Sequence, residues 1–185
     1  MHTAHIELLQ QMPIFGGLRA DALGILLDEA TTVQVPAQAF FFREGDPAVS
    51  MFVLERGHVA VLRTWQGREL LLSRFKQGDC FGEMALLDLF PRSASVRAEA
   101  DCTAIELTPA HLYRLYERDA AQFAMVQMNI AREISRRLRE TDDLLFRARM
   151  AAEAVANAAA DPAVSPVAVP VAPADGGPNP GGRAL

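Results

Sequence analysis

The sequence predicts a mainly β domain flanked by helices, and two observations support this fold class. Between residues 31 and 107, short apolar runs alternate with turn signals at intervals of roughly 8 to 12 residues, which is typical of an antiparallel sandwich or barrel. On either side of this region, apolar residues recur three and four positions apart, as on one face of a helix. The chain has 185 residues, 50% of them hydrophobic, so we expect one domain with a sizeable core.

Two short helices are expected at the N-terminal end. Ile6, Leu9 and Met12 have helical spacing, and Pro13 ends that helix. A glycine pair follows, and the second helix carries Leu23, Leu26, Leu27 and Ala30. The expected strands contain the apolar runs at residues 40–42, 51–54, 58–62 and 70–72. Residues 81–87 interrupt the strands with a stretch that is predicted to be helical.

Two further helices are expected after the last strand. Thr108 can cap a helix and Pro109 fits its first turn, so the first of the two is predicted to run through Tyr116. A longer helix is predicted from about residue 120 to residue 160. Its second part has a heptad seam with one polar member, Thr141, made of Ala131, Ile134, Leu138, Thr141, Leu145, Ala148, Ala152 and Val155.

This seam predicts a homodimer. Residues of opposite charge four positions apart support its exposed flanks, as in Glu133 with Arg137. A seam of about 25 residues is longer than a barrel of this size can cover, so we expect two such helices to pair in parallel. The alternative is a single helix that lies on the barrel.

Composition limits the classes of function and the folded region. A net charge of −5 argues against a nucleic-acid partner, whose binding depends on neutralising phosphates. No apolar stretch approaches the roughly 20 residues that cross a bilayer, and the start lacks a signal peptide, so we expect no membrane partner and a cytoplasmic protein. Cys80 and Cys102 are expected to be buried, reduced thiols. Residues 1–160 form the expected folded domain, and residues 161–185, rich in Ala, Pro and Gly, an expected flexible tail.

Residues 81–96 carry the most specific chemistry. Gly82 at the start of a short helix lets backbone N–H groups approach an anion closely. Arg92 can offer paired donors to two phosphate oxygens, and Ser93 with the amide of Ala94 can complete the cradle. Glu83 would be costly beside a phosphate unless it faced a hydroxyl group or an arginine. The segment therefore indicates a ligand that has both phosphate and sugar.

This stretch resembles the phosphate-binding cassette of the cyclic nucleotide-binding domain family. The family pattern is Gly-Glu-apolar-Ala-Leu, a short loop and then Pro-Arg-small-Ala, and it matches residues 82–86, which include Met84 and Ala85, and residues 91–96. The resemblance extends over residues 6 to about 150. It implies a jelly-roll-like antiparallel β-roll with N-terminal helices and a long C-terminal dimerisation helix. It also implies that Arg92 and the backbone of residues 93 and 94 hold a cyclic phosphate, while Glu83 accepts from the ribose 2′-hydroxyl.

The long helix is similar to the dimer helix of the catabolite-activator branch of this family. Thr141 occupies the position at which that branch contacts the base. The next residue is Asp142, where the branch commonly has a serine that contacts the ligand of the other subunit, so this departure puts that contact in doubt. Arg137 corresponds to an arginine that can pair with the cassette glutamate. The sequence leaves two possible partners for Arg137: Glu83 in the cassette, or Glu133 one turn away on the same helix.

The base of the ligand is less defined than its phosphate. The hydroxyl of Ser93 suits cyclic AMP or cyclic GMP, whereas Thr141 as a partner for an adenine amino group favours cyclic AMP. Cyclic di-GMP is a further alternative. We expect the apolar wall of the pocket to come from Val61, Leu72 and Phe81.

Three other functions are compatible with parts of this sequence. A DNA-binding regulator would need a basic recognition helix after the dimer helix, where this sequence has its Ala, Pro and Gly-rich end. A metal enzyme would need clustered histidines and carboxylates, but the four histidines are scattered, so we expect no catalysis, no metal and no cofactor. A scaffold that has lost its ligand is the third. We expect instead a cyclic nucleotide receptor that signals through its dimer helix to an effector protein.

Overall fold

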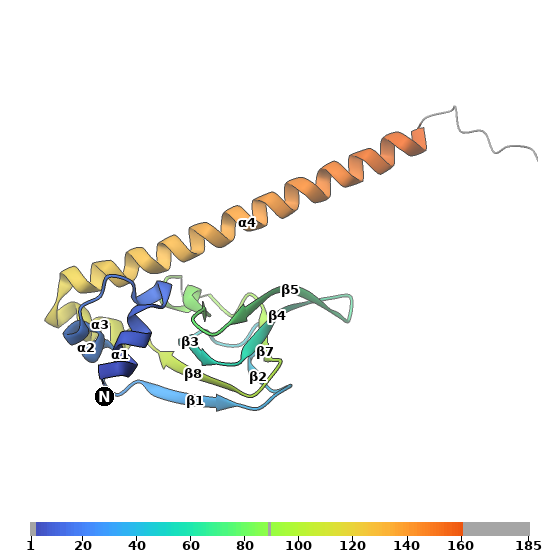
Figure 1. Ribbon diagram of the computed structural model, residues 1–185. Coiled ribbons are helices and arrows are strands. Elements are labelled where there is room, and N and C mark those ends of the chain that lie inside the picture. Colours follow the sequence, from blue (N-terminus) through green and yellow to red (C-terminus); the bar gives the residue numbers. More distant parts are fainter. Residues whose placement is uncertain (1–2, 89, 161–185) are drawn as a thin grey trace, which may run out of the picture. The chain divides into compact units, whose positions relative to one another are not determined.

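The computed structural model describes residues 3–88 and 90–160. Eight strands form two four-stranded antiparallel sheets that face each other as a roll (Figure 1). The strands are β1 (Thr31–Val35), β2 (Phe40–Phe42), β3 (Met51–Arg56), β4 (His58–Trp65), β5 (Arg68–Lys76), β6 (Cys80–Phe81), β7 (Ser95–Ala98) and β8 (Cys102–Leu107). One sheet has the order β1-β8-β3-β6 and the other the order β2-β7-β4-β5.

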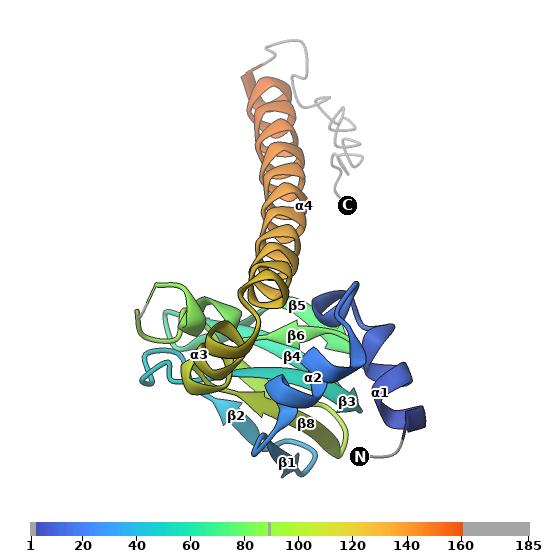
Figure 2. The same cartoon turned by 90° about the vertical axis from the view of Figure 1, so that its left-hand side faces the viewer.

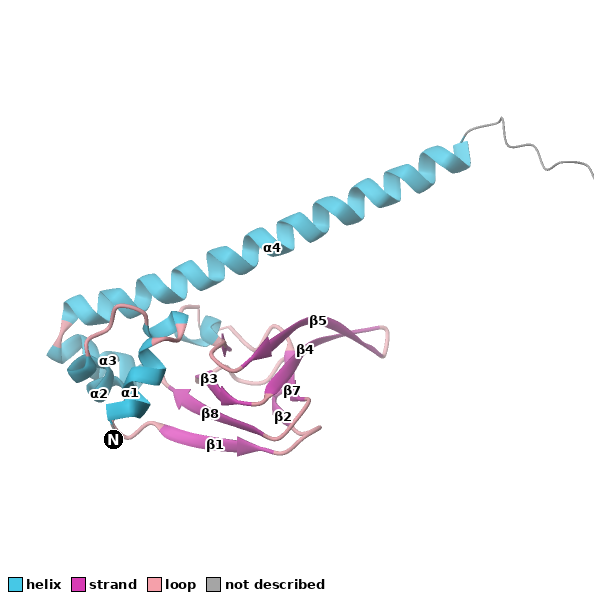
Figure 3. Ribbon diagram, viewed as in Figure 1, coloured by secondary structure: helices cyan, strands magenta, loops and turns pink. Residues whose placement is uncertain are grey.

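Helices lie before, within and after the strand region. They are α1 (Thr3–Gln10), η1 (Pro13–Phe15), α2 (Ala20–Leu27), η2 (Glu83–Leu86), α3 (Pro109–Arg118) and α4 (Ala120–Ala160), where η1 and η2 are 3-10 helices. Figures 2 and 3 show α1, α2 and α3 together at one end of the sheets, where α2 contacts both of the others. The expected fold class, a β-roll with N-terminal helices and a long C-terminal helix, is confirmed.

The body has two apolar cores. One lies inside the roll and holds side chains from both sheets, with Leu54, Val59 and Ala98 fully buried. The other lies between the helices and the first sheet and contains Phe15 and Leu115. The first core determines the shape of the candidate site, because its aromatic rings form the floor of a pocket.

Side-chain to backbone hydrogen bonds attach the start of α4 to the body. Asn129 is buried, and its Nδ2 donates to the carbonyl oxygens of Ile14 at 3.1 Å and Gly16 at 2.8 Å. The side chain of Gln122 accepts from the backbone N–H of Arg19 at 2.8 Å. The first turns of α4 are therefore fixed in register against the loop between α1 and α2.

The chain divides into two compact units, of which the body ends at Glu140 and the second begins at Thr141. In the second unit, every described side chain from residue 141 to residue 157 is exposed. The large exposed apolar residues there are Leu144, Leu145, Phe146, Met150 and Val155. The expected tail, residues 161–185, lies outside the described residues.

Residues 81–87 differ from the sequence expectation. The helix predicted for the whole stretch is shorter, because β6 still includes Phe81 and the 3-10 helix η2 covers only Glu83–Leu86. Gly82 lies between them with φ of 73°, which is left-handed backbone that cannot continue either element.

Burial of both cysteines gives a first prediction. Cys80 and Cys102 are free and buried, as expected, and burial raises the pKa of the Cys80 thiol to about 12 and that of Cys102 in the same direction. Because the thiolate is the reactive form, we expect Ellman's reagent at about pH 8 to label the folded protein at less than a tenth of the rate of the unfolded chain. Rapid labelling of either cysteine in the folded protein would contradict this arrangement.

Candidate functional site

A cavity of about 170 Å³ opens between the roll and the segment that follows β6. Its floor is aromatic: Phe42, Phe75 and Phe81 line it, and the rings of Phe75 and Phe81 stack with an interplanar angle of 8°. Floor and walls together include ten of the residues that the sequence singled out, namely Val61, Phe81, Gly82, Glu83, Met84, Ala85, Arg92, Ser93, Ala94 and Arg137.

Leu72 was expected in the apolar wall, and the structure corrects this. Val61 pairs with Ser73 and Leu62 with Leu71, so Leu72 is an extra residue that has no partner across the β4–β5 ladder. A bulge of this kind changes the alternation of side chains along the strand. Leu72 is 53% exposed and is not in the lining, which Phe75 joins instead.

Thr141 and Asp142 belong to the part of α4 beyond the body. Both side chains are exposed in the described chain. Their expected contacts with the ligand therefore stay predictions.

Gly82 makes room for the arginine of the site. A Cβ atom at this position would lie 2.6 Å from Nη1 of Arg92 and 3.3 Å from the Phe42 ring. A side chain is therefore excluded both by the positive φ and by the guanidinium that fills the space above the glycine.

Arg92 is buried in the cavity wall with few partners. It is 7% exposed; Nη1 donates to the carbonyl oxygen of Gly82 at 3.2 Å, and Nη2 lies 3.5 Å from Oγ of Ser50. Its Nε is buried and has no hydrogen-bond partner. Burial lowers the pKa of Arg92, against the more distant charges of Glu106, Asp46 and Glu83. A buried cation that lines a cavity and has an unused donor and no carboxylate partner is suited to binding an anion.

The backbone of Arg92 is fixed by the loop between β2 and β3. Its N–H donates to the carbonyl oxygen of Asp46, and its carbonyl accepts from the N–H of Gly45, both at 2.9 Å. These bonds hold the Pro91-Arg92 turn against the roll. Ser93 and Ala94 follow directly and line the cavity beside the guanidinium.

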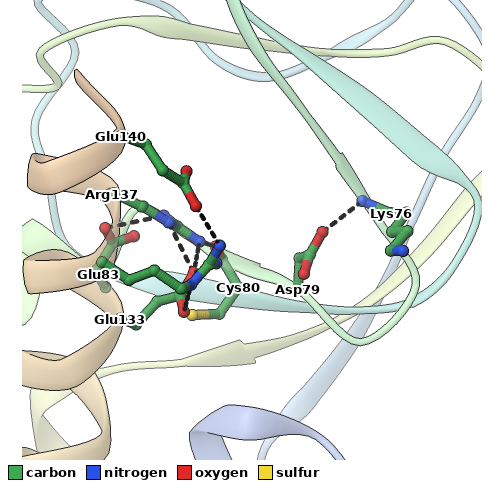
Figure 4. Close-up of polar contacts among 8 residues, drawn as sticks. Lys76, Asp79, Cys80, Glu83, Glu133, Arg137 and Glu140 are labelled. Carbon is green, nitrogen blue, oxygen red and sulfur yellow. Dashed lines mark hydrogen bonds and ion pairs between the residues drawn. The ribbon is translucent and has the colours of Figure 1, made fainter. Parts of the chain in front are cut away.

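A second arginine joins α4 to the cassette (Figure 4). Nη1 of Arg137 donates to Glu83 at 3.0 Å, its Nε donates to Glu133 at 2.8 Å, and its Nη2 donates to the carbonyl oxygen of Cys80. The guanidinium also lies over the Phe75 ring, 4.2 Å from its centroid. The two pairings that the sequence left open are therefore present together.

Glu133 is the carboxylate that both neighbouring arginines share. Burial alone would raise its pKa, but the hydrogen bond from Arg136 and the charges of Arg137 and Arg136 outweigh burial and the pKa is lowered. Glu83 is 6% exposed and is held by Arg137. Glu83 and Glu133 are thus engaged by Arg137 and Arg136 rather than by Arg92.

Sequence reasoning missed Phe42, Ser50 and Phe75 as residues of the site. Phe42 is in a run of three phenylalanines that indicated only a strand, and Ser50 precedes β3 without a motif. Pairing of β2 with β7 brings Phe42 next to the cassette. Alternation along the strand could not have identified Phe42, because the neighbouring Phe41 also packs on the core and the register of β2 shifts between Phe40 and Phe42.

Comparison with known proteins agrees with this geometry. The family described as the cyclic nucleotide-binding domain matches residues 32–119. The chain therefore carries a domain of the cyclic nucleotide-binding family, as its cassette indicated.

Similar proteins are regulators. The chain is 34% identical over 99 residues to the cAMP-dependent protein kinase regulatory subunit of Emericella nidulans, covering 54% of this chain and 24% of that subunit. The crystal structure of the Thermus thermophilus catabolite activator protein has 31% identity and a TM-score of 0.65, over 74% of this chain and 63% of that chain. A c-di-GMP responsive global regulator of Xanthomonas campestris has 26% identity and a TM-score of 0.62, over 70% and 64%. The chain thus spans less than two thirds of the length of each.

No helix in the described part of the chain is long and apolar enough to cross a membrane. Among the same residues, no group of three or more His, Cys, Asp and Glu side chains could hold a metal ion.

The space above Gly82 gives the second prediction. Gly82→Ala should destabilise the fold by more than Gly67→Ala, because both glycines have positive φ and only Gly82 faces the Arg92 guanidinium. The backbone cost shared by both variants is about 1–2 kcal/mol. Urea unfolding of the two variants measures the difference, and equal losses would show that Arg92 moves aside without cost.

Proposed function

We propose that the protein is a cyclic nucleotide receptor and that its ligand is cyclic AMP. The observation that carries this proposal is the buried Arg92 guanidinium, whose Nε has no partner and which lines a cavity of the family's cassette. The cyclic phosphate would take these donors together with the backbone of Ser93 and Ala94. The ribose 2′-hydroxyl would donate to Glu83, and the base would lie against the apolar wall that includes Val61 and Phe81.

The choice of cyclic AMP has two supports. First, one similar protein is named a cAMP-dependent protein kinase regulatory subunit and another, from Thermus thermophilus, a cyclic AMP receptor protein. Second, Thr141 offers a hydroxyl at the position that contacts the base in the catabolite-activator branch. Cyclic GMP is compatible with Ser93. Cyclic di-GMP is the second candidate, because a similar regulator is named for its response to it. A cavity with one buried arginine suits a ligand with one phosphate better than one with two.

Signalling would pass through α4 to another protein. The heptad seam of α4 includes Leu138, Leu145 and Val155, which are 59%, 51% and 71% exposed in the single chain, so pairing in a parallel homodimer would bury them. An effector protein would then read the ligand-dependent state of that dimer. The net charge of −5 makes direct contact with DNA unfavourable, and two free buried thiols suit a reducing compartment such as the cytoplasm.

Titration calorimetry of the full chain against cyclic AMP, cyclic GMP and cyclic di-GMP tests the function. We expect one cyclic AMP per chain, and no measurable binding by Arg92→Ala, because each charge-assisted hydrogen bond that is lost contributes about 1.5–3 kcal/mol. Arg74→Ala is the matched control, since Arg74 is an exposed arginine that pairs with Glu99. Unchanged affinity of the Arg92 variant, or no binding of any of the three by the wild type, would refute the proposal.

Thr141 provides a separate test of base recognition. We expect Thr141→Ala to weaken cyclic AMP more than cyclic GMP, because guanine has a carbonyl oxygen where adenine has its amino group, and a hydroxyl placed to accept from the amino group would have to reorient to donate to that carbonyl. Ser135→Ala removes a hydroxyl from the same helix and should change neither affinity. If Thr141→Ala weakens both nucleotides equally, Thr141 does not select the base.

A further inference from the structure

We propose that Phe42 is the positioning residue of Arg92: its ring holds the buried guanidinium in place before the anion arrives. The centre of the guanidinium lies 3.9 Å from the centroid of the Phe42 ring, whereas Phe52 is 6.0 Å away. The inference rests on the proposed function only for the identity of the anion. The contact itself belongs to the ligand-free protein and can be tested without ligand.

The need for such a contact follows from the burial of Arg92. A buried cation requires compensation, and its two hydrogen-bond acceptors are a carbonyl at 3.2 Å and a hydroxyl at 3.5 Å, both uncharged. The acidic groups that influence Arg92 do so at a distance, and two of them are bound elsewhere. Glu83 accepts from Arg137, and Asp46 accepts from the backbone N–H of Arg43 at 2.7 Å. The negative face of the Phe42 ring is therefore the close electrostatic partner that the described residues supply.

The Phe42 ring stacks on the face of the Arg92 guanidinium, and this geometry is compatible with anion binding at the guanidinium edge. The donors of a guanidinium lie in its plane, whereas an aromatic ring stacks on its face. Phe42 can therefore stabilise the cation and leave its edge, which includes the buried, unpartnered Nε, without a carboxylate acceptor. A carboxylate in the same role would occupy the edge and compete with the ligand. Phe42 thus compensates the charge of Arg92 without occupying any of its hydrogen-bond donors.

Phe42 also has a matched control in its own strand. Phe41 and Phe42 both lie in β2 and both rings contact Phe52 and Phe81, at centroid distances of 5.0 to 6.2 Å. The described contacts of Arg92 include the Phe42 ring and not the Phe41 ring. Loss of either ring removes aromatic packing from the same core, but only the loss of Phe42 should affect the guanidinium.

The binding experiment compares Phe42→Leu, Phe42→Tyr and Phe41→Leu by calorimetry with cyclic AMP. We expect Phe42→Leu to weaken binding about tenfold, while Phe42→Tyr, which keeps an aromatic face, and Phe41→Leu stay within about threefold of the wild type. Equal losses in Phe42→Leu and Phe41→Leu would overturn the inference and leave the proposed function intact, because the loss would then reflect core packing alone.

The second measurement is a double-mutant cycle on the ligand-free protein. Phe42→Leu is made in the wild type and in Arg92→Met, which removes the charge and keeps an extended side chain, and urea unfolding is followed for all four proteins. We expect Phe42→Leu to lower the unfolding midpoint by less in the Arg92→Met background, where no buried cation is left uncompensated. Equal shifts in both backgrounds would overturn the inference, even if the protein proved to bind no cyclic nucleotide.

Discussion

The buried guanidinium of Arg92 is the constraint on which the rest of the site depends. Desolvation of an unpaired charge costs several kcal/mol, and a fold retains such a group only when its surroundings compensate for it. Here the compensation comes from uncharged neighbours: the Gly82 carbonyl, the Ser50 hydroxyl and the face of Phe42. The glycine at position 82 follows from the same constraint, since any side chain there would occupy the space of the guanidinium.

The two arginines of the cavity differ in how their charge is balanced. Arg137 has two carboxylates and a carbonyl oxygen as partners, so its charge is locally neutralised within the protein. Arg92 has no such carboxylate partner among its described contacts, and its pKa is lowered by burial. Glu83, which lines the same cavity as Arg92, accepts from Arg137. The separation of the two roles leaves one positive charge without a carboxylate partner, and under the proposed function its location defines where a phosphate would lie.

Local sequence patterns predicted the parts of the site that are continuous in the chain. Gly82, Glu83 and Arg92 could be assigned because their roles depend on a turn, a short helix and a loop within about fifteen residues. Residues that reach the site through strand pairing could not be assigned in this way. Phe42 and Ser50 are 40 to 50 positions from Arg92 and approach it only in the folded roll. Leu72 was misplaced because the bulge in β5 has no clear signal in a run of three leucines.

The hydrogen bonds of Arg137 suggest how a ligand would alter the contacts between the cassette and α4. Its partner Glu133 lies four residues earlier on the same helix, so this pair persists whatever α4 does as a whole. Its bonds to Glu83 and to the Cys80 carbonyl cross to the roll and depend on the position of the helix. A ribose hydroxyl that donates to Glu83 would compete with Arg137 for that carboxylate. Arg137 could then release the cassette without losing its charge partner, because Glu133 remains. Since a ligand shifts an equilibrium only by its different affinity for the two states, this exchange at Glu83 would provide such a difference near the start of α4.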